Sequence, residues 1–145
     1  MMRYILFMIL ILGMLSACSL ERNNPLDPQA NPDIKIPPEV TGLTLSSAGF
    51  TVTARWHRVN DESIGSYYLY SCMTHNGVYE RIAVVEQPSN PYVFEVIYTD
   101  ERILLPFNFY YYKVSAVTKP IQHPTLGMVG LEGKLSDLNY VQVVE

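Results

Sequence analysis

The chain has 145 residues, of which 17% are charged, and its formal net charge at pH 7 is −4. Lysine and arginine do not cluster anywhere, so the sequence predicts no nucleic-acid partner and no polybasic contact with anionic lipid. Arg3 is the only charged residue among residues 1–17, so loss of that segment would change the net charge to −5. Roughly 105 residues then follow a short tether, which is enough for one domain.

The first residues have the pattern of a signal peptide. Arg3 precedes an almost unbroken apolar run over residues 4–15. This run is shorter than the about 20 residues of a membrane-spanning helix, and it fits a signal-peptide core. We therefore assign residues 1–17 to a signal peptide that is removed from the mature protein.

The end of the apolar run, Leu15-Ser16-Ala17-Cys18, resembles the lipobox of bacterial lipoproteins. The resemblance implies that Cys18 receives diacylglycerol through its thiol and becomes the first residue after cleavage. It also implies further acyl chains at the new N-terminus, and more than one chain makes a stable membrane anchor. Ser19 rather than Asp follows the cysteine, which in Gram-negative relatives implies the outer membrane. The alternative is an ordinary secretory peptide with an incidental cysteine.

Residues 18–37 have the composition of a tether. Prolines alternate there with asparagine and aspartate, and such a segment cannot bury enough apolar surface to fold. Within it, Asn24-Pro25-Leu26-Asp27-Pro28 resembles a short motif in the tethers of some bacterial lipoproteins. We expect a spacer, and docking of this motif to a partner is the alternative.

Residues 38–145 alternate in the manner of β-strands and show no convincing helix, which predicts an all-β fold and argues against a parallel α/β sheet. The inward positions are expected to include Trp56, Tyr67 and Tyr110. Asn76-Gly77 predicts a hairpin that uses positive φ angles. The expected strands start near Val40 and then cover residues 51–56, 66–73, 78–85, 92–99, 109–117 and 138–144, with residues 119–127 as a loop.

Several short motifs of residues 38–145 resemble fibronectin type III domains. Leu104, Pro106 and Tyr110 match the approach to the sixth strand of that family, although Asn108 replaces the usual threonine. The opening Pro-x-x-Val-x-x-Leu, the Tyr-x-Leu-Tyr at Tyr67 and the glycine-rich stretch from Gly130 also match, with Gly133 where the family usually has serine. The resemblance implies an antiparallel immunoglobulin-like β-sandwich of about seven strands. It also implies a tyrosine corner, in which the Tyr110 hydroxyl bonds to the chain just upstream.

The sequence contains no pattern typical of catalysis. Its three histidines lie far apart, and it lacks both Gly-x-Ser-x-Gly and a glycine-rich phosphate loop. The acidic pairs Asp61-Glu62 and Asp100-Glu101 are expected in solvated loops and fall short of a calcium shell. We therefore predict no enzymatic activity, no cofactor and no metal. Cys72 has no disulfide partner once Cys18 is lipidated.

The candidate binding site is a group of tyrosines. Strand alternation predicts that Tyr68, Tyr70 and Tyr111 point outward on one sheet, together with Phe109 and Tyr79. Exposed aromatic clusters often mark binding sites, but outward tyrosines also occur simply because tyrosine favours strands.

The expected function is that of a non-catalytic binding or adhesion module, anchored by lipid in the cell envelope, with a protein or polysaccharide partner. A structural subunit of an envelope assembly and a carbohydrate-binding accessory protein are the alternatives. The fold alone does not select among these three functions, because one fold serves many functions.

Overall fold

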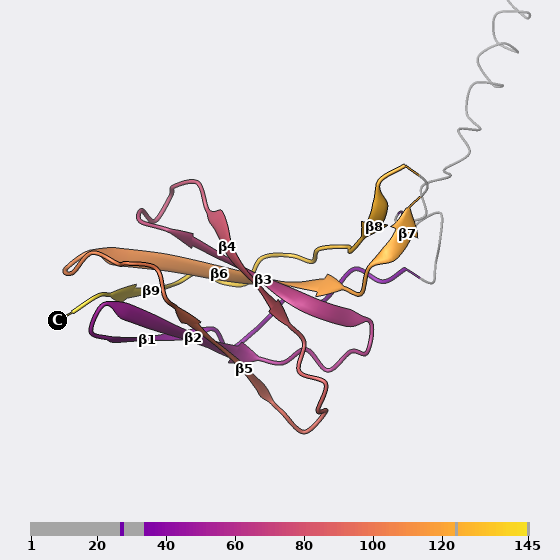
Figure 1. The fold of residues 1–145 in the computed structure, drawn as a ribbon, viewed down its shortest axis with the longest axis horizontal. Helices are drawn as coiled ribbons and strands as arrows, with labels where there is room; N and C mark the ends of the chain where they lie inside the picture. The colour runs from indigo at the N-terminus through magenta and orange to yellow at the C-terminus, as the bar shows by residue number, and fades with distance from the viewer. Residues whose placement is uncertain (1–26, 28–33, 124, 145) are drawn as a thin grey trace, which may run out of the picture. The chain divides into compact units, whose positions relative to one another are not determined.

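The computed structural model describes residues 27, 34–123 and 125–144, and residues 35–144 belong to one compact unit built from strands. Figure 1 shows the described strands in two layers with a small ribbon beside them. No helix occurs among the described residues. The strands are β1 (Thr44–Ala48), β2 (Thr51–His57), β3 (Ile64–Cys72), β4 (Glu80–Glu86), β5 (Glu95–Asp100), β6 (Phe109–Thr118), β7 (Ile121–His123), β8 (Gly127–Val129) and β9 (Asn139–Gln142).

The strands form an antiparallel sandwich. One sheet has the order β1-β2-β5 and the other has the order β4-β3-β6-β9. These seven strands confirm the predicted sandwich. The expectation of a plain loop over residues 119–127 is wrong, because β7 and β8 pair there as a separate two-stranded ribbon.

The core lies between the two sheets and contains the residues that alternation predicted to point inward. Trp56 on β2 and Tyr67 on β3 are fully buried, and their rings meet edge to face with centroids 5.6 Å apart. Tyr110 and Tyr112 on β6 are also buried. Period-two alternation therefore located the buried face of the three central strands correctly.

The first strand begins later than predicted. Val40 is buried in the core, but β1 starts only at Thr44. Gly42 has φ +72°, and a Cβ atom there would lie 2.5 Å from the ring of His57. The chain therefore bends at Gly42, where only glycine fits, and residues 38–43 do not continue the strand.

The hairpin between β3 and β4 occurs where it was predicted, but it is not built as predicted. Positive φ angles in the described chain occur at Phe107 and at three glycines, and neither Asn76 nor Gly77 is among them. Glycine is needed at position 77 because a Cβ there would collide with the Thr74 hydroxyl and the Cys72 sulfur. The turn thus requires close approach rather than a left-handed backbone.

The predicted signal peptide, Cys18 and most of the tether lie outside the described residues; Asp27 is the one residue of the Asn-Pro motif that is described. Among the residues that the structure covers, no helix is long and apolar enough to cross a membrane.

Candidate functional site

Tyr68, Tyr70 and Tyr111 lie on the outer face of the sheet β4-β3-β6-β9, and all three side chains are partly exposed. The register of β3 and β6 places Cys72 beside Tyr111, Tyr70 beside Lys113, and Tyr68 beside Ser115. Tyr70 is therefore a diagonal neighbour of Tyr111 across the two strands, and Tyr68 lies farther along the sheet. Among the described residues, no ring contact joins Tyr111 to Tyr68 or Tyr70.

The Tyr70 hydroxyl is already hydrogen-bonded to another residue of the domain. It donates a hydrogen bond of 2.7 Å to Oε1 of Glu132, which also accepts a bond of 2.5 Å from Ser115. Glu132 reaches these strands because backbone bonds from Gly133 to Ala116 and from Thr118 to Leu131 hold its segment along β6. Burial, followed by the bond to Glu132, raises the pKa of Tyr70 to about 12. Its hydroxyl thus holds the segment at Glu132 onto the sheet.

Tyr68 is also covered by a neighbour. The guanidinium carbon of Arg81, on β4, lies 4.5 Å from the centre of the Tyr68 ring, which is the geometry of a cation–π contact. A similar contact places Nζ of Lys113 4.8 Å from the ring centre of Tyr79. Cations therefore stand over two of the outward tyrosine rings, and the face at Tyr68 and Tyr70 is a mixed polar surface.

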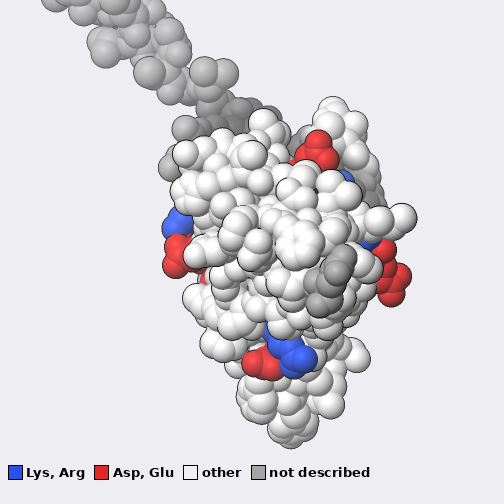
Figure 2. Space-filling view, turned by 90° about the vertical axis from the view of Figure 1, so that its left-hand side faces the viewer, with Lys and Arg blue, Asp and Glu red and all other residues white. Residues whose placement is uncertain are grey.

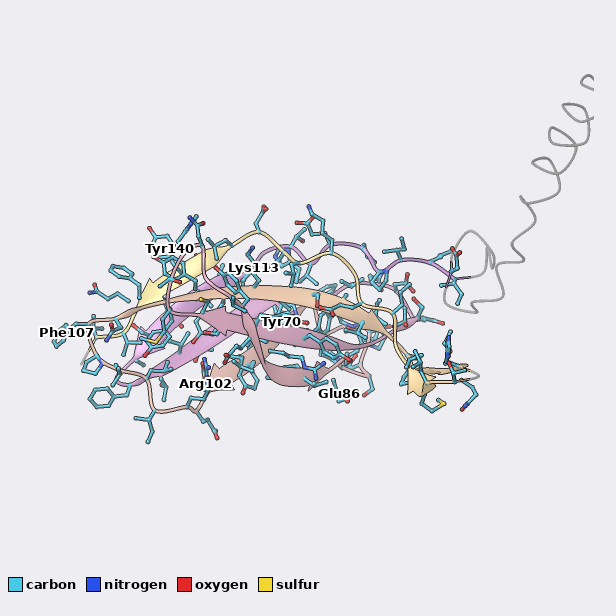
Figure 3. All side chains as sticks on the ribbon, turned by 90° about the horizontal axis from the view of Figure 1, so that it is seen from above. Tyr70, Glu86, Arg102, Phe107, Lys113 and Tyr140 are labelled. Carbon is cyan, nitrogen blue, oxygen red and sulfur yellow. The ribbon has the colours of Figure 1, made fainter. Side chains whose placement is uncertain are left out.

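Tyr111 belongs to a different group, which we call the aromatic cluster: His75, Phe109, Tyr111 and Tyr140. The ring of Tyr111 lies 5.6 Å from that of Tyr140 and 5.8 Å from that of His75, and Phe109 lies 6.0 Å from Tyr140. Tyr140 is 58% exposed and Phe109 is 44% exposed. Figure 3 shows Tyr140 on β9 towards one end of the sheet, whereas Tyr70 and Lys113 lie side by side nearer its middle. This cluster is the largest group of connected, accessible rings that the described residues form on this sheet.

Two members of the cluster were missed in the sequence. Tyr140 could have been found, because alternation in the last strand puts it opposite in direction to the inward Val141 and Val143. The register then sets it directly beside Tyr111. His75 gives no such signal, since its position depends on how the β3–β4 hairpin folds over the sheet.

Cys72 lies on the same face, beside Tyr111, and is a free thiol. Its sulfur is 3.5 Å from the backbone nitrogen of Thr74 and 3.6 Å from the Thr74 hydroxyl. These hydrogen bonds lower the pKa of the Cys72 thiol.

The acidic pairs do not form a metal site. Asp61 accepts a 2.8 Å bond from the backbone N–H of Ser63, which closes a local turn, and the side-chain and backbone hydrogen bonds from Ser63 lower the pKa of Asp61. Asp100 is not solvated as predicted: it is 1% exposed and ends β5 in the interior. Within the described part of the chain, no three histidine, cysteine, aspartate or glutamate residues gather in a way that could hold a metal ion.

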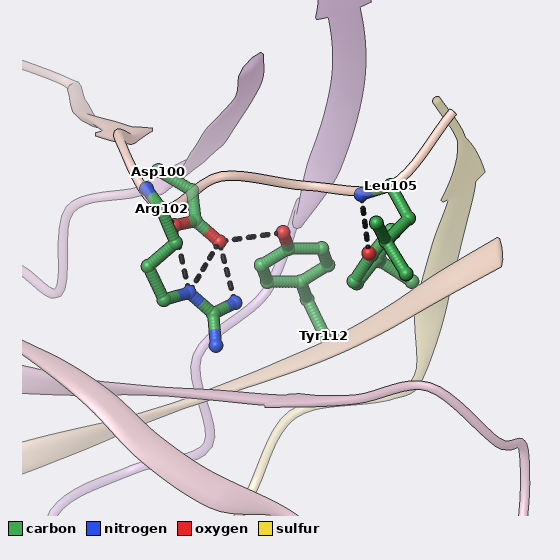
Figure 4. Close-up of polar contacts among 5 residues, drawn as sticks. Asp100, Arg102, Leu105 and Tyr112 are labelled. Atoms are coloured by element: carbon green, nitrogen blue, oxygen red, sulfur yellow. Dashed lines mark hydrogen bonds and ion pairs between the residues drawn. The ribbon is translucent and has the colours of Figure 1, made fainter. Parts of the chain in front are cut away.

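Asp100 is instead neutralised by a partner close in sequence. Nε of Arg102 lies 2.9 Å from one carboxylate oxygen, Nη2 lies 2.6 Å from the other, and the Tyr112 hydroxyl donates to the latter at 2.8 Å (Figure 4). Burial raises the pKa of Asp100, but the bonds from Arg102 and Tyr112 outweigh it, so this pKa lies below its ordinary value. This group is structural.

The tyrosine corner occurs as the family resemblance implied. The Tyr110 hydroxyl accepts a hydrogen bond of 2.8 Å from the backbone N–H of Leu105, five residues upstream. Figure 4 shows this bond beside the Asp100 group, so both contacts hold the segment between β5 and β6 against the body of the sandwich.

Comparison with solved structures supports the same fold. A fibronectin type III-like protein from Clostridium thermocellum is 25% identical, with a TM-score of 0.56 over 77% of this chain and 97% of that one. The FN1–FN3 domains of chicken CNTN1 give 16% identity and a TM-score of 0.51 over 75% of this chain and 33% of that one. No family model matches the sequence, and no curated protein matches it either. The described domain thus has a fibronectin type III-like fold.

Proposed function

We propose that this protein is a non-catalytic binding module, held in the cell envelope by lipid on Cys18, that binds a protein partner through the aromatic cluster. The fold supports the general part of this proposal, because fibronectin type III-like domains generally act as binding or adhesion modules. The aromatic cluster is the observation that carries the specific part. Its rings come from β6, β9 and the β3–β4 hairpin, so the sheet holds them in fixed positions.

The chemistry of the cluster suits a protein interface. Tyrosine and phenylalanine are enriched at the centres of such interfaces because they bury a large area with few rotatable bonds. Tyr140 and Phe109 keep about half of their surface accessible, while the contacts of Tyr140 with Tyr111 and with Phe109 fix their orientation. Lys113, two residues after Tyr111 on the same face of β6, borders the cluster and would supply a polar rim. These rings would therefore lose little side-chain entropy when a partner covers them.

The position of the cluster is compatible with an anchor at Cys18. The domain begins near Pro37, which lies against Gly133, and the Gly133 N–H bonds to Ala116 near the end of β6. Phe109 and Tyr111, in contrast, lie at the start of β6. A chain tethered through residues 18–34 would thus present the cluster away from its attachment point. The anchor itself is inferred from the resemblance of residues 15–18 to the lipobox.

Carbohydrate binding is the second candidate. The rings of Tyr111 and Tyr140 are inclined by 38°, so together they offer an open, partly flat surface of the kind on which sugar rings stack. A structural subunit of an envelope assembly would use the same surface permanently, and it would differ from a transient binder in stoichiometric co-purification.

The proposal is tested with a photo-crosslinking amino acid at Tyr140 in the full-length protein, expressed in its own cells. Ile97 is the control position, because it is 52% exposed but lies on β5 in the other sheet. We expect a protein adduct of defined size from position 140, none from position 97, and loss of the adduct when Tyr111→Ser is added. No adduct at 140, or the same adduct at 97, would contradict the proposal. Retention of the purified chain on a polysaccharide column, lost in Tyr140→Ser, would instead favour the carbohydrate candidate.

A further inference from the structure

One end of the sandwich carries an unusual number of exposed apolar side chains. The β1–β2 turn, the β3–β4 hairpin and the segment between β5 and β6 all lie there, because Val52 pairs with Asp100 and Cys72 pairs with Tyr111. Each residue of the group is at least half exposed, and Ile103, at 94%, is the most exposed of them. We call this group the apolar tip: Phe50, Met73, Val78, Ile103, Leu105 and Phe107.

Charge is scarce on this end. Figure 2 views the molecule from this side, and uncharged residues fill most of the face while the coloured charges lie mainly towards its margins. Arg102 is the cation nearest in sequence to the tip, and its charge is already balanced by Asp100. The six apolar side chains themselves carry no charge, but the exposed Glu101 adjoins Arg102 and Glu80 lines the cleft at the tip.

The tip is also hollowed. A cleft of about 460 Å³ lies between the β3–β4 hairpin and the segment after β5. Met73 and Val78 belong to one wall, Ile103 and Leu105 to the other, and the buried Tyr110 lies between them. The face therefore combines a projecting apolar side chain, Ile103, with a recess whose lining is mostly apolar but also includes Glu80 and Arg102.

The backbone at the tip is strained in a way that exposes an aromatic ring. Phe107 has φ +61°, which a bulky residue rarely adopts. Its N–H donates to the carbonyl of Val143 at 2.8 Å, and its own carbonyl accepts a 3.2 Å bond from Gln142. The neighbouring chain thus holds the strained conformation, and the ring remains 66% exposed. Such strain, of about 1–3 kcal/mol, is concentrated at functional sites.

We propose that the apolar tip binds the apolar tip of a second copy of this chain. Such a contact between identical faces requires a surface that is complementary to itself, and a knob beside a recess meets this requirement. The six side chains that would meet carry no charge, so repulsion between the two copies would come from residues beside the tip, such as Glu101.

The available area matches a specific dimer. The exposed fractions of the six side chains amount to about four fully exposed large residues. At about 150–200 Å² each, complete burial would cover at most roughly 600–800 Å² per copy, which approaches the about 800 Å² per partner of a standard interface. A bilayer is the less suitable occupant, because Arg102 and Glu80 line the cleft and would carry charge towards the hydrocarbon.

The proposal has a geometric consequence. The chain enters the sandwich at the end opposite the tip, where Pro37 contacts Gly133. Figure 1 shows the C-terminus and the β5–β6 segment at one end and the described start of the domain at the other. A tip-to-tip pair therefore places its two chain entries at its far ends. If the lipid anchor of the proposed function is correct, the pair would join copies held on facing surfaces.

The test is the oligomeric state of residues 18–145 with Cys18→Ser, which contain the whole sandwich. Sedimentation velocity from about 1 µM to about 1 mM should show a reversible monomer–dimer equilibrium. This concentration range covers the dissociation constants of weak to moderate contacts. Ile103→Asp should weaken dimerisation at least about 100-fold, because it places an unpaired charge in the interface. Ile97→Asp is the matched control and should leave the equilibrium unchanged. Thermal melting checks that both variants are folded.

Cross-linking identifies the surface that is used. In a Cys72→Ser background that still dimerises, Ile103→Cys should form a disulfide-linked dimer on mild oxidation, and Lys134→Cys, near the chain entry, should not. A parent chain that stays monomeric to about 1 mM, an equal effect of Ile97→Asp, or preferential linkage at position 134 would overturn the proposal. So would co-sedimentation of a monomeric parent with phosphatidylcholine vesicles, lost in Ile103→Asp. None of these results depends on the adduct at Tyr140, so the two proposals can fail separately.

Discussion

Replacing Arg102 by methionine should destabilise the domain because it leaves the carboxylate of Asp100 buried without its cation. Asp100 is 1% exposed and receives both Nε and Nη2 of Arg102, whereas methionine preserves most of the apolar stem and none of the charge. Removal of one partner from a fully buried pair typically costs about 3–5 kcal/mol.

The expected cost here is smaller, because the Arg102 side chain is 44% exposed and water can replace part of its contribution. Tyr112 and the backbone N–H of residue 102 would also still bond to Asp100. We therefore expect a loss of about 2–3 kcal/mol of unfolding free energy, or a fall of roughly 8–15 °C in Tm for a domain of this size. Arg55→Met is the control; Arg55 is exposed on β2, and its loss should change stability by less than about 0.5 kcal/mol.

The pH dependence follows from the lowered pKa of Asp100. A carboxyl whose pKa is lower in the folded than in the unfolded state stabilises the fold above the unfolded value, near about 3.9, and loses this contribution as pH falls through the folded value. Arg102→Met removes part of that contribution. Urea unfolding should thus show the largest gap between parent and variant at neutral pH and a narrower gap near about pH 3.

A double-mutant comparison decides whether charge is the cause. In an Asp100→Asn background the buried group is neutral, so adding Arg102→Met should cost clearly less than it does in the parent. An equal cost in both backgrounds, or a gap that widens towards low pH, would refute the explanation by an uncompensated carboxylate.

The remaining predictions concern the core, the tyrosine corner and the anchor. Trp56→Ala should cost about 3–5 kcal/mol because the ring is fully buried against Tyr67, and a Tm within a few degrees of the parent would contradict this. Tyr110→Phe should cost about 1 kcal/mol in urea unfolding through loss of the bond to Leu105, and no change would mean that water replaces it fully. Cells given labelled palmitate should label the full-length protein but not Cys18→Ser, and equal labelling would rule out lipidation at that residue.

Alternation along the chain was sufficient to predict which side chains of the central strands are buried, because each of these strands has one buried face. Val52, Ala54 and Trp56 on β2 are all buried, and the residues between them are not. A shift by one residue would move this whole set to the solvent, so the pattern determines the direction of each side chain. The strand ends were less predictable, since β1 begins only after the close approach of Gly42 to His57.

Contacts between distant segments were not predictable. Ser115 lies on the outward face of β6 and is nevertheless fully buried, because the segment carrying Glu132 covers it. The same segment engages Tyr70, and this separates Tyr70 from the aromatic cluster around Tyr111. Alternation gives the direction of a side chain but not what lies over it. The three predicted tyrosines thus all lie on the sheet that carries the aromatic cluster, but only Tyr111 and Phe109 of the expected aromatic residues belong to the cluster, and Tyr140 and His75 were not predicted.

Phe107 offers a direct measurement of the strain that the apolar tip contains. In an ordinary loop position, alanine is more stabilising than glycine by about 0.4–1 kcal/mol, because glycine gains more entropy on unfolding. At φ +61° the order should reverse, since glycine adopts this conformation freely and alanine does not. Both variants lose the same ring, which is two-thirds exposed, and both keep the N–H that bonds to Val143.

We therefore expect Phe107→Gly to exceed Phe107→Ala in unfolding free energy by about 1 kcal/mol, measured in urea. Both variants should weaken self-association of the tip, because each removes the same exposed aromatic surface. A glycine variant that is more stable than the parent and yet dimerises less would mean that the conformation at Phe107 is maintained at the expense of stability in order to present the ring. Alanine proving as stable as glycine would mean that the backbone at this position relaxes, and the strain would then give no support to a functional tip.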